Sequence, residues 1–405
     1  AGNATELISL VLSNNEMSGV LPPSLWDLSR LQVLDLSYNQ LSGTITDDLN
    51  NLVWLVTLNL RNNLFSGEFP RDVNKMEKLD FLWLDHNRLT GSLPPLEAGF
   101  VASQEISFSH NFLTGSLPDL DPVAVLAIIN SVRILRLDVS HNFISGTITD
   151  AVSFLPTLRS VDASGNLFTG EFPARSGWGS IESLAAADNF FSGTISTVWP
   201  AKLKHFDMSG NLLNGTIPSD FCKLPNLEFL MLSRNELDGT IPSCITNVDK
   251  LRAMEFSNAG LNGPIPDGID QLRDLTLLNL SHNTLTGQLP STLTRLTLLN
   301  QLHVNGNLLS GRIPSDLDKL TFLRQLHLDQ NAFVGSIPST FAALTGLESF
   351  SVAGNALTGS VPEGLCQLST IKLSAEEIGC DVECSCCQED NEGCGMNFFG
   401  LSSLS

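Results

Sequence analysis

One asparagine recurs at nearly constant spacing along the chain of 405 residues, and this repeat limits the fold more than any other feature. A typical unit begins at Leu31 and reads LQVLDLSYNQLSGTI, with its asparagine at Asn39. The same position holds asparagine at residues 15, 39, 63, 87, 111, 142, 166, 189, 211, 235, 283, 307, 331 and 355, and alanine at Ala259. Every unit also has glycine four residues later, from Gly19 to Gly359. A period of about 24 residues predicts fifteen stacked coils of a solenoid.

The residues around the asparagine predict how each coil is built. Leu34 and Leu36 should face inward on a short strand, with Asp35 between them facing out. Equivalent strands of neighbouring coils should pair in parallel, which covers every strand edge except those at the two ends. We expect the buried asparagines to bond to turn backbone groups as a ladder, and the glycine to allow a tight bend. At Ala259 the ladder lacks a rung, so we expect a water molecule or a distorted turn there.

After the glycine, most units read Ile or Leu followed by Pro, as in Ile217-Pro218, Ile241-Pro242 and Ile313-Pro314. This L-x-G-x-I-P motif resembles the plant-type leucine-rich repeats of receptor-kinase ectodomains and polygalacturonase-inhibiting proteins, over about residues 7–373. The resemblance implies an α/β solenoid, curved as a right-handed superhelix with a parallel β-sheet on its concave face. It also implies a second short strand around Gly-x-Ile in each coil and a helical turn on the convex side.

The C-terminal tail is rich in cysteine and departs from the plant pattern. Its sequence CDVECSCC, residues 380–387, looks more like the caps of secreted leucine-rich-repeat proteins of diatoms and related algae. We therefore expect a solenoid over residues 1–373, with an apolar insertion at about 121–133, and a disulfide-rich cap and tail over residues 374–405. The N-terminus lacks a signal peptide and a cap, so we expect it to be processed or cut from a longer protein.

The charge balance narrows the range of partners. The chain has 43 acidic and 22 basic residues and a formal net charge of −21. That charge argues against nucleic acid and anionic membranes as partners and suits a cationic peptide, a divalent cation or a neutral glycan. Apolar runs stay shorter than the roughly 18 residues of a membrane span.

Cysteines and glycosylation sequons predict a secreted protein or one on the outer cell surface. The cysteines fall in two even-numbered groups, which suits disulfides and therefore an oxidising compartment. The disulfide candidates are Cys222, Cys244, Cys366, Cys380, Cys384, Cys386, Cys387 and Cys394, and the glycosylation candidates are Asn3, Asn214 and Asn279.

The outward strand positions supply the candidate binding residues. The strongest group is aromatic, because exposed aromatic side chains are common binding anchors: Tyr38, Phe81, Trp83 and His86. A second group is an acidic strip that suits Ca²⁺ or a basic ligand: Asp138, Asp162 and Asp207, continued by Glu255. A third is the pair His303 and His327, about 5 Å apart on adjacent coils, which suits Zn²⁺, Cu²⁺ or a pH-sensitive patch. All seven histidines map to outward positions: 86, 110, 141, 205, 282, 303 and 327.

These features predict a recognition module that binds a glycan, peptide or protein through its concave face. A structural or adhesive component of an extracellular matrix or cell wall, which self-associates, is one alternative. An inhibitor of a wall-degrading enzyme is another. The sequence shows no signature of a hydrolase triad, phosphate loop, zinc protease or kinase, so we expect no enzyme, cofactor or resident metal.

Overall fold

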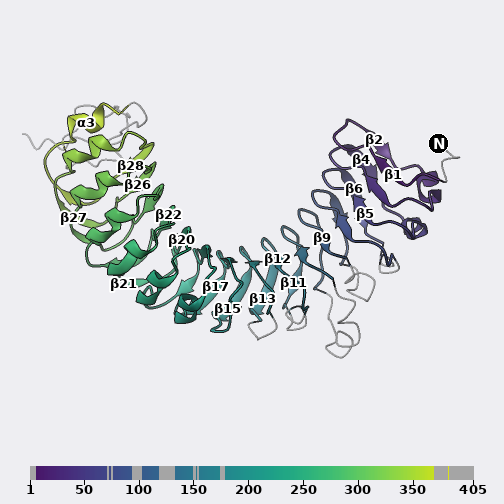
Figure 1. The fold of residues 1–405 in the computed structure, drawn as a ribbon, viewed down its shortest axis with the longest axis horizontal. Helices are drawn as coiled ribbons and strands as arrows, with labels where there is room; N and C mark the ends of the chain where they lie inside the picture. Colours follow the sequence, from purple (N-terminus) through teal and green to yellow (C-terminus); the bar gives the residue numbers. More distant parts are fainter. Residues whose placement is uncertain are drawn as a thin grey trace, which may run out of the picture. The chain divides into compact units, whose positions relative to one another are not determined.

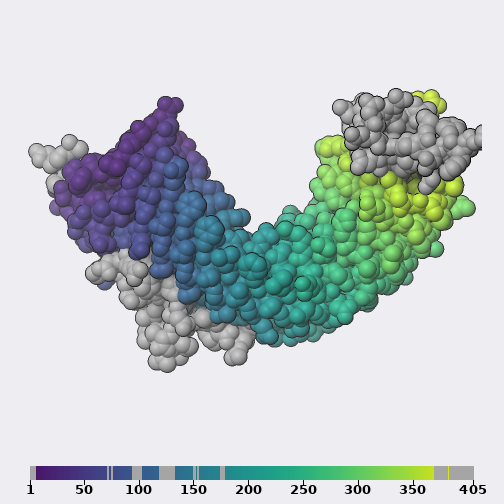
Figure 2. All heavy atoms as spheres, turned by 180° about the vertical axis from the view of Figure 1, so that it is seen from behind, coloured from purple at the N-terminus to yellow at the C-terminus, as the bar shows by residue number. Residues whose placement is uncertain are grey.

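The computed structural model describes residues 6–70, 73, 76–93, 103–117, 133–148, 152, 155–173, 178–368 and 382. The chain divides into two compact units, Ala1–Leu227 and Glu228–Ser405, called unit 1 and unit 2 below. In each unit the coils stack on one another, with a main strand in every coil lying parallel to that of the next (Figure 1). The space-filling view shows each unit as successive bands of closely packed coils (Figure 2). The predicted α/β solenoid of parallel strands is confirmed.

Each main strand is three residues long, and every one except the first, at residues 9–11, buries its middle residue. Leu34, the middle residue of β3, is fully buried, and the residues on either side of it are half-buried. The main strands of unit 1 are β1 (Ser9–Val11), β3 (Val33–Asp35), β5 (Thr57–Asn59), β7 (Phe81–Trp83), β9 (Glu105–Ser107), β10 (Arg136–Asp138), β12 (Ser160–Asp162), β14 (Ser183–Ala185) and β16 (His205–Asp207). Those of unit 2 are β18 (Phe229–Met231), β20 (Ala253–Glu255), β22 (Leu277–Asn279), β24 (Gln301–His303), β26 (Gln325–His327) and β28 (Ser349–Ser351). The outward residues of these strands form the strand face of each unit.

A second strand follows in most coils, slightly earlier than the resemblance implied. Strand β4 covers Gln40–Gly43 and ends at the glycine, whereas Ile45 lies beyond it with its side chain buried. Gly43 has a φ of +90°, but the equivalent glycines Gly19 and Gly67, with φ of +88° and +81°, lie inside their second strands, so the glycine bend does not itself end the strand. The others are β2 (Ser18–Val20), β6 (Leu64–Glu68), β8 (Arg88–Thr90), β11 (Ser145–Gly146), β13 (Leu167–Glu171), β15 (Phe190–Thr194) and β17 (Leu212–Gly215) in unit 1, and β19 (Glu236–Leu237), β21 (Asn262–Pro264), β23 (Thr284–Thr286), β25 (Ser310–Arg312), β27 (Ala332–Gly335) and β29 (Ala356–Leu357) in unit 2.

Short helices complete the coils on the side away from the main strands. Most begin after a proline, whose fixed φ suits a helix start. The exception is η2, which begins after Thr46. The 3-10 helices are η1 (Pro23–Asp27), η2 (Asp47–Asn51) and η5 (Ser219–Lys223) in unit 1, and η6 (Ser243–Asn247), η7 (Asp267–Gln271), η8 (Ser291–Arg295), η9 (Ser315–Lys319) and η10 (Ser339–Ala343) in unit 2, which also contains the α-helix α3 (Glu363–Cys366). No helix within the described ranges is long and apolar enough to cross a membrane.

The asparagine ladder forms as predicted and distorts at the missing rung. Most of the asparagines accept from a backbone N–H of one coil and donate to carbonyls of two coils, as Asn63 does. Beside Ala259, Asn283 accepts hydrogen bonds from two backbone N–H groups, those of Ala259 and Leu261, each at 3.0 Å. Gly260 takes a φ of +77° and comes so close to Leu237 that an added Cβ would lie 2.2 Å from its carbonyl oxygen. The predicted distorted turn is therefore present.

The residue directly before each ladder position has a positive φ in all fifteen coils. The values lie between 49° at Asn258 and 65° at Gly306. This is the left-handed region, in which β-branched side chains are strained and glycine, asparagine and histidine are better tolerated. We call this residue the turn position. It turns the chain out of the main strand and holds its side chain beside the strand face.

Several predictions fall on residues whose structure is not described. They are the insertion at 121–132, the sequon at Asn3, the cap over residues 374–405 apart from Val382, and the cysteines Cys380, Cys384, Cys386, Cys387 and Cys394. The division into a solenoid and a cap stays a prediction. Cys222, Cys244 and Cys366 are each disulfide-bonded.

Candidate functional site

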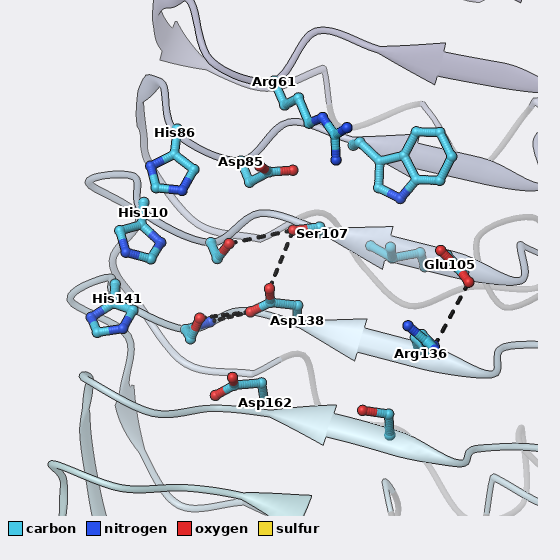
Figure 3. Close-up of a pocket in the computed structure, with 15 residues that line it drawn as sticks. Arg61, Asp85, His86, Glu105, Ser107, His110, Arg136, Asp138, His141 and Asp162 are labelled. Carbon is cyan, nitrogen blue, oxygen red and sulfur yellow. Dashed lines mark hydrogen bonds and ion pairs between the residues drawn. The ribbon is translucent and has the colours of Figure 1, made fainter. Parts of the chain in front are cut away.

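A hollow of about 530 Å³ opens on the strand face of unit 1. It spans the strands β7, β9, β10 and β12 with the turns that follow them, and Arg61 of the preceding coil closes one end (Figure 3). Polar and charged side chains dominate its wall. The lining residues are Arg61, Trp83, Asp85, His86, Glu105, Ile106, Ser107, Ser109, His110, Arg136, Asp138, Ser140, His141, Ser160 and Asp162.

Trp83 and Arg61 line the end of the hollow nearest the N-terminus, whereas the predicted residues Phe81 and Tyr38 are not part of its lining. The Phe81 and Trp83 ring centroids lie 5.4 Å apart. The Arg61 guanidinium carbon lies 5.2 Å from the Tyr38 ring centroid and 5.9 Å from that of Trp83, within reach of a cation–π contact with each. Tyr38, at the turn position of its coil, is therefore joined to Trp83 through the coil between them. Sequence reasoning did not include Arg61, because only its long side chain connects the two rings.

Carboxylates form the floor of the hollow. Asp138 and Asp162 lie opposite each other in the register of β10 and β12, as predicted. One oxygen of Asp138 accepts hydrogen bonds from Ser140, at 3.0 Å from its backbone N and 2.7 Å from its hydroxyl, and the other faces the Ser107 hydroxyl at 3.5 Å. The floor thus presents adjacent carboxylates that are held in place by hydroxyl and backbone donors.

Two of the aspartates are harder to ionise than usual. Burial raises the pKa of Asp162, against the opposing hydrogen bonds from Ser164, and the nearby Asp138 charge adds to the rise. Burial also raises the pKa of Asp85, although its own backbone and the Arg61 charge oppose the rise. A cationic ligand group placed beside these carboxylates would stabilise their ionised form.

An ion pair marks the edge of the hollow opposite the turns. Arg136 Nε lies 3.7 Å from Glu105 Oε1, and Figure 3 shows this pair apart from the aspartates. The lining therefore holds four carboxylates, Asp85, Glu105, Asp138 and Asp162, against the guanidinium groups of Arg61 and Arg136. With neutral histidines, the hollow carries a net negative charge.

Three histidines form a row along the other edge. His86, His110 and His141 occupy turn positions on consecutive coils, with φ values of 54°, 53° and 52°. The ring centroids of His86 and His110 lie 4.1 Å apart, and those of His110 and His141 lie 4.2 Å apart. Partial burial, together with the neighbouring His86 and His141 charges, lowers the pKa of His110. We call these residues the histidine row.

The histidines predicted to share one kind of outward position occupy two. His205, His303 and His327 lie in main strands, whereas the row and His282 lie at turn positions. His303 and His327 are paired in register in unit 2, and their rings stack with centroids 4.4 Å apart. Their Nε2 atoms face Gln325 Oε1 at 3.0 Å and Ser349 Oγ at 2.8 Å. No group of three or more His, Cys, Asp or Glu that could hold a metal ion occurs among the described residues.

The acidic strip has a gap of one coil between Asp162 and Asp207, as their spacing in the sequence indicates. Ala185 pairs with Asp162 on one side and with Asp207 on the other, so an alanine interrupts the carboxylates. Asp207 lies outside the hollow, and Glu255 belongs to unit 2. Of the sequons, Asn214 is exposed in β17 and Asn279 is half-buried in β22.

Comparison with known families agrees with this architecture. A Leucine rich repeat family model matches residues 2–41, and a second one matches residues 54–76, 202–224, 226–248 and 274–296. The fold and these matches define a leucine-rich-repeat protein. Its repeats are of the plant type and resemble those of plant receptor ectodomains.

Curated relatives include receptor-like proteins of Arabidopsis thaliana. Receptor-like protein 7 is 37% identical over 100 residues, which are 24% of this chain and 10% of the relative. Receptor-like protein 43 is 34% identical over 90 residues, which are 22% of this chain and 13% of the relative. The chain therefore matches a small part of each of these longer proteins.

Solved structures match over most of the chain. The crystal structure of PEPR1–AtPEP1 is 30% identical with a TM-score of 0.82, and the match covers 93% of this chain and 52% of that one. The plant peptide hormone receptor RGFR1 in complex with RGF2 is 30% identical with a TM-score of 0.78, over 91% and 63%. A TDR receptor is 28% identical with a TM-score of 0.82, also over 91% and 63%. The chain thus spans about half to two thirds of each of these chains.

Proposed function

We propose that this protein is an extracellular recognition module of the receptor-ectodomain type, and that it binds a peptide with a basic group at the hollow of unit 1. The observation that carries the proposal is the composition of the hollow, with an aromatic wall at Trp83 and excess carboxylates on its floor. Its role is binding rather than catalysis. The similar solved structures support a peptide ligand, because they include PEPR1–AtPEP1 and a peptide hormone receptor with RGF2.

The physical basis is charge complementarity inside a partly enclosed space. An ammonium or guanidinium group between Asp138 and Asp162 is attracted by both carboxylates, which occupy paired positions on neighbouring strands. The apolar part of such a side chain packs against Trp83, whose ring also attracts a cation. The chain's net charge of −21 increases the rate at which a basic peptide reaches this face.

A titration with the peptide tetralysine tests the proposal, with binding measured by calorimetry at pH about 7.5. Asp138→Asn and Asp162→Asn each remove one charge from the floor, and we expect each to weaken binding roughly tenfold, or about 1.4 kcal/mol. Asp207→Asn is the matched control, since Asp207 occupies the same strand position outside the hollow and accepts from Ser209 N at 2.9 Å. It should leave the affinity within about twofold of that of the unmodified protein.

Other outcomes point to the alternative functions. Equal weakening by all three substitutions would show general attraction to an acidic surface and would contradict a site at the hollow. Self-association that persists in the Asp138→Asn and Asp162→Asn variants, without tetralysine binding in the unmodified chain, would favour an adhesive or structural role. Binding of a neutral oligosaccharide that depends on Trp83 would favour a glycan ligand.

A further inference from the structure

The histidine row borders the same hollow as the carboxylates, and the charges of Asp85 and Asp138 act on His110. His86, His110 and His141 all line the hollow together with Asp85, Asp138 and Asp162 (Figure 3). We infer that the histidine row is a pH gate for the hollow, which accepts a basic ligand when the imidazoles are neutral and releases it when they are protonated. This inference rests on the proposed function, because it assigns the regulation of the same site.

The charge balance of the hollow gives the gate its direction. Four carboxylates and two guanidinium groups line the hollow, so its fixed side chains leave an excess of two negative charges. Protonation of two histidines cancels this excess, and protonation of the third makes the hollow positive. A basic ligand is then repelled from a site that attracted it before.

The stacking geometry couples the three titrations. With ring centroids 4.1 and 4.2 Å apart, an imidazolium next to another imidazolium is disfavoured by like-charge repulsion. His110 has a histidine on each side, whereas His86 and His141 each have one. Partial burial and these two neighbours lower the pKa of His110, so His110 should gain its proton at a lower pH than an ordinary histidine.

The other charged groups around the row act in both directions. Asp85 and Asp138 favour protonation of the histidines, and both raise the pKa of His110 in part. Asp162 lies on the far side of Asp138 in the register, and Arg61 at the end of the hollow disfavours another positive charge. Glu105 and Arg136 are engaged with each other at the opposite edge.

The row is bounded by turn positions without a ring. The preceding coil has Asn62 there, and the next coil has Gly165, whose backbone packs so closely on the His141 ring that an added Cβ would lie 2.7 Å from Nδ1. The stack of rings therefore begins at His86 and ends at His141, and the gate consists of these three side chains.

Asparagine is a suitable replacement for each histidine of the row. Asn14, Asn62 and Asn258 already occupy turn positions in this chain, with φ values of 56°, 54° and 49°. The triple variant His86→Asn, His110→Asn, His141→Asn therefore removes the titrating groups without straining the turns. His282→Asn is the matched control, because His282 has the same backbone conformation at a turn position of unit 2.

Tetralysine binding at pH about 7.5 and about 5.5 tests the gate, since lysine stays charged at both values. The unmodified chain and His282→Asn should each lose at least about tenfold in affinity at the lower pH, and the triple variant less than about threefold. The triple variant retains every carboxylate, so a loss caused by carboxylate protonation would remain in it. An equal loss in the triple variant, or no loss in the unmodified chain, would overturn the gate.

Histidine NMR titration without any ligand separates a failed gate from a failed binding site. In the unmodified chain the pKa of His110 should lie below the ordinary value of histidine, and the double variant His86→Asn, His141→Asn should raise it, because both neighbouring charges are removed. If tetralysine does not bind at any pH, the proposed basic-peptide site is wrong, and with it the gate as a control of binding. If the double variant leaves the pKa of His110 unchanged, the coupling on which the gate depends is absent.

Discussion

The Oδ1 atom of Asn63 accepts a hydrogen bond from the backbone N–H of Leu41 on the preceding coil, 2.9 Å away. The Nδ2 atom of the same side chain donates to Leu36 O at 2.9 Å and to Leu60 O at 3.2 Å. One buried amide thus satisfies backbone groups of two coils. The repeat of this arrangement explains why the chain keeps an asparagine in nearly every coil.

We expect Asn63→Ala to lower the free energy of unfolding by about 1–3 kcal/mol, because buried backbone groups lose their partners. Urea denaturation followed by circular dichroism measures the change. Asn300→Ala removes an exposed amide that bonds to Phe322 O at 3.1 Å, and it should cost less than about 0.5 kcal/mol. Similar costs for both substitutions would show that the ladder is not a main source of stability.

Two glycines with positive φ allow the stability cost of backbone strain to be measured separately from the cost of a steric clash. Gly19 has a φ of +88° and nothing within 4 Å of an added Cβ, whereas at Gly260 that atom would lie 2.2 Å from Leu237 O. We expect Gly19→Ala to cost about 1 kcal/mol and Gly260→Ala about 3 kcal/mol, since the latter adds a clash with backbone to the strain. Thermal or urea unfolding of both variants measures this. Equal costs would contradict the close contact at the distorted turn.

The pair His303 and His327 should make stability depend on pH. Burial, and then the His327 charge, lower the pKa of His303 in the folded chain. Below about pH 6.5 the unfolded chain therefore binds more protons than the folded one, and stability falls as the pH falls from there to the folded pKa.

Substitution of one member of that pair checks this dependence. His327→Asn removes the second charge, and asparagine already occupies this strand position at Asn59 and Asn279. It should raise the pKa of His303 and flatten the decline in unfolding free energy between about pH 6.5 and pH 5. An unchanged decline would show that His327 does not contribute to it.

Trp83 should be the main aromatic contact of the hollow. We expect Trp83→Ala to weaken tetralysine binding roughly tenfold, because it removes the apolar wall and a ring that attracts cations. Trp54→Ala is the control, since Trp54 is exposed and, like Trp83, faces a cation, with Lys78 Nζ 3.6 Å from its ring centroid, but lies outside the hollow. Calorimetry measures the tetralysine affinity of both variants. An equal loss of affinity in both would show that Trp83 is not part of the binding site.

The sequence predicted the parts of the fold that depend on residues within one period. The main strands, the ladder, the bend at Gly43 and the distortion at Ala259 follow from local pattern, and so does the juxtaposition of Asp138 and Asp162. The second strands came slightly earlier than expected, around the glycine rather than around the isoleucine that follows it. The residue types before each ladder position, which include no β-branched side chain, held an unused signal for the left-handed turn.

The hollow itself was beyond sequence reasoning. The prediction placed Trp83 and His86 in the aromatic group, and Asp138 and Asp162 in the acidic strip. Only the stacking of coils brings the two groups together in the lining of one hollow. Arg61 and the pair of Glu105 with Arg136 join that wall through long side chains, whose conformations depend on their neighbours.

Hydrogen–deuterium exchange of the full chain with and without saturating tetralysine tests the central claim most directly, because it locates the binding surface without any substitution. We predict slower exchange in the strands and turns at residues 81–87, 105–111, 136–142 and 160–166, which surround the hollow, with little change in unit 2. Protection confined to unit 2, or spread evenly over the acidic surface, would contradict a ligand site at this hollow.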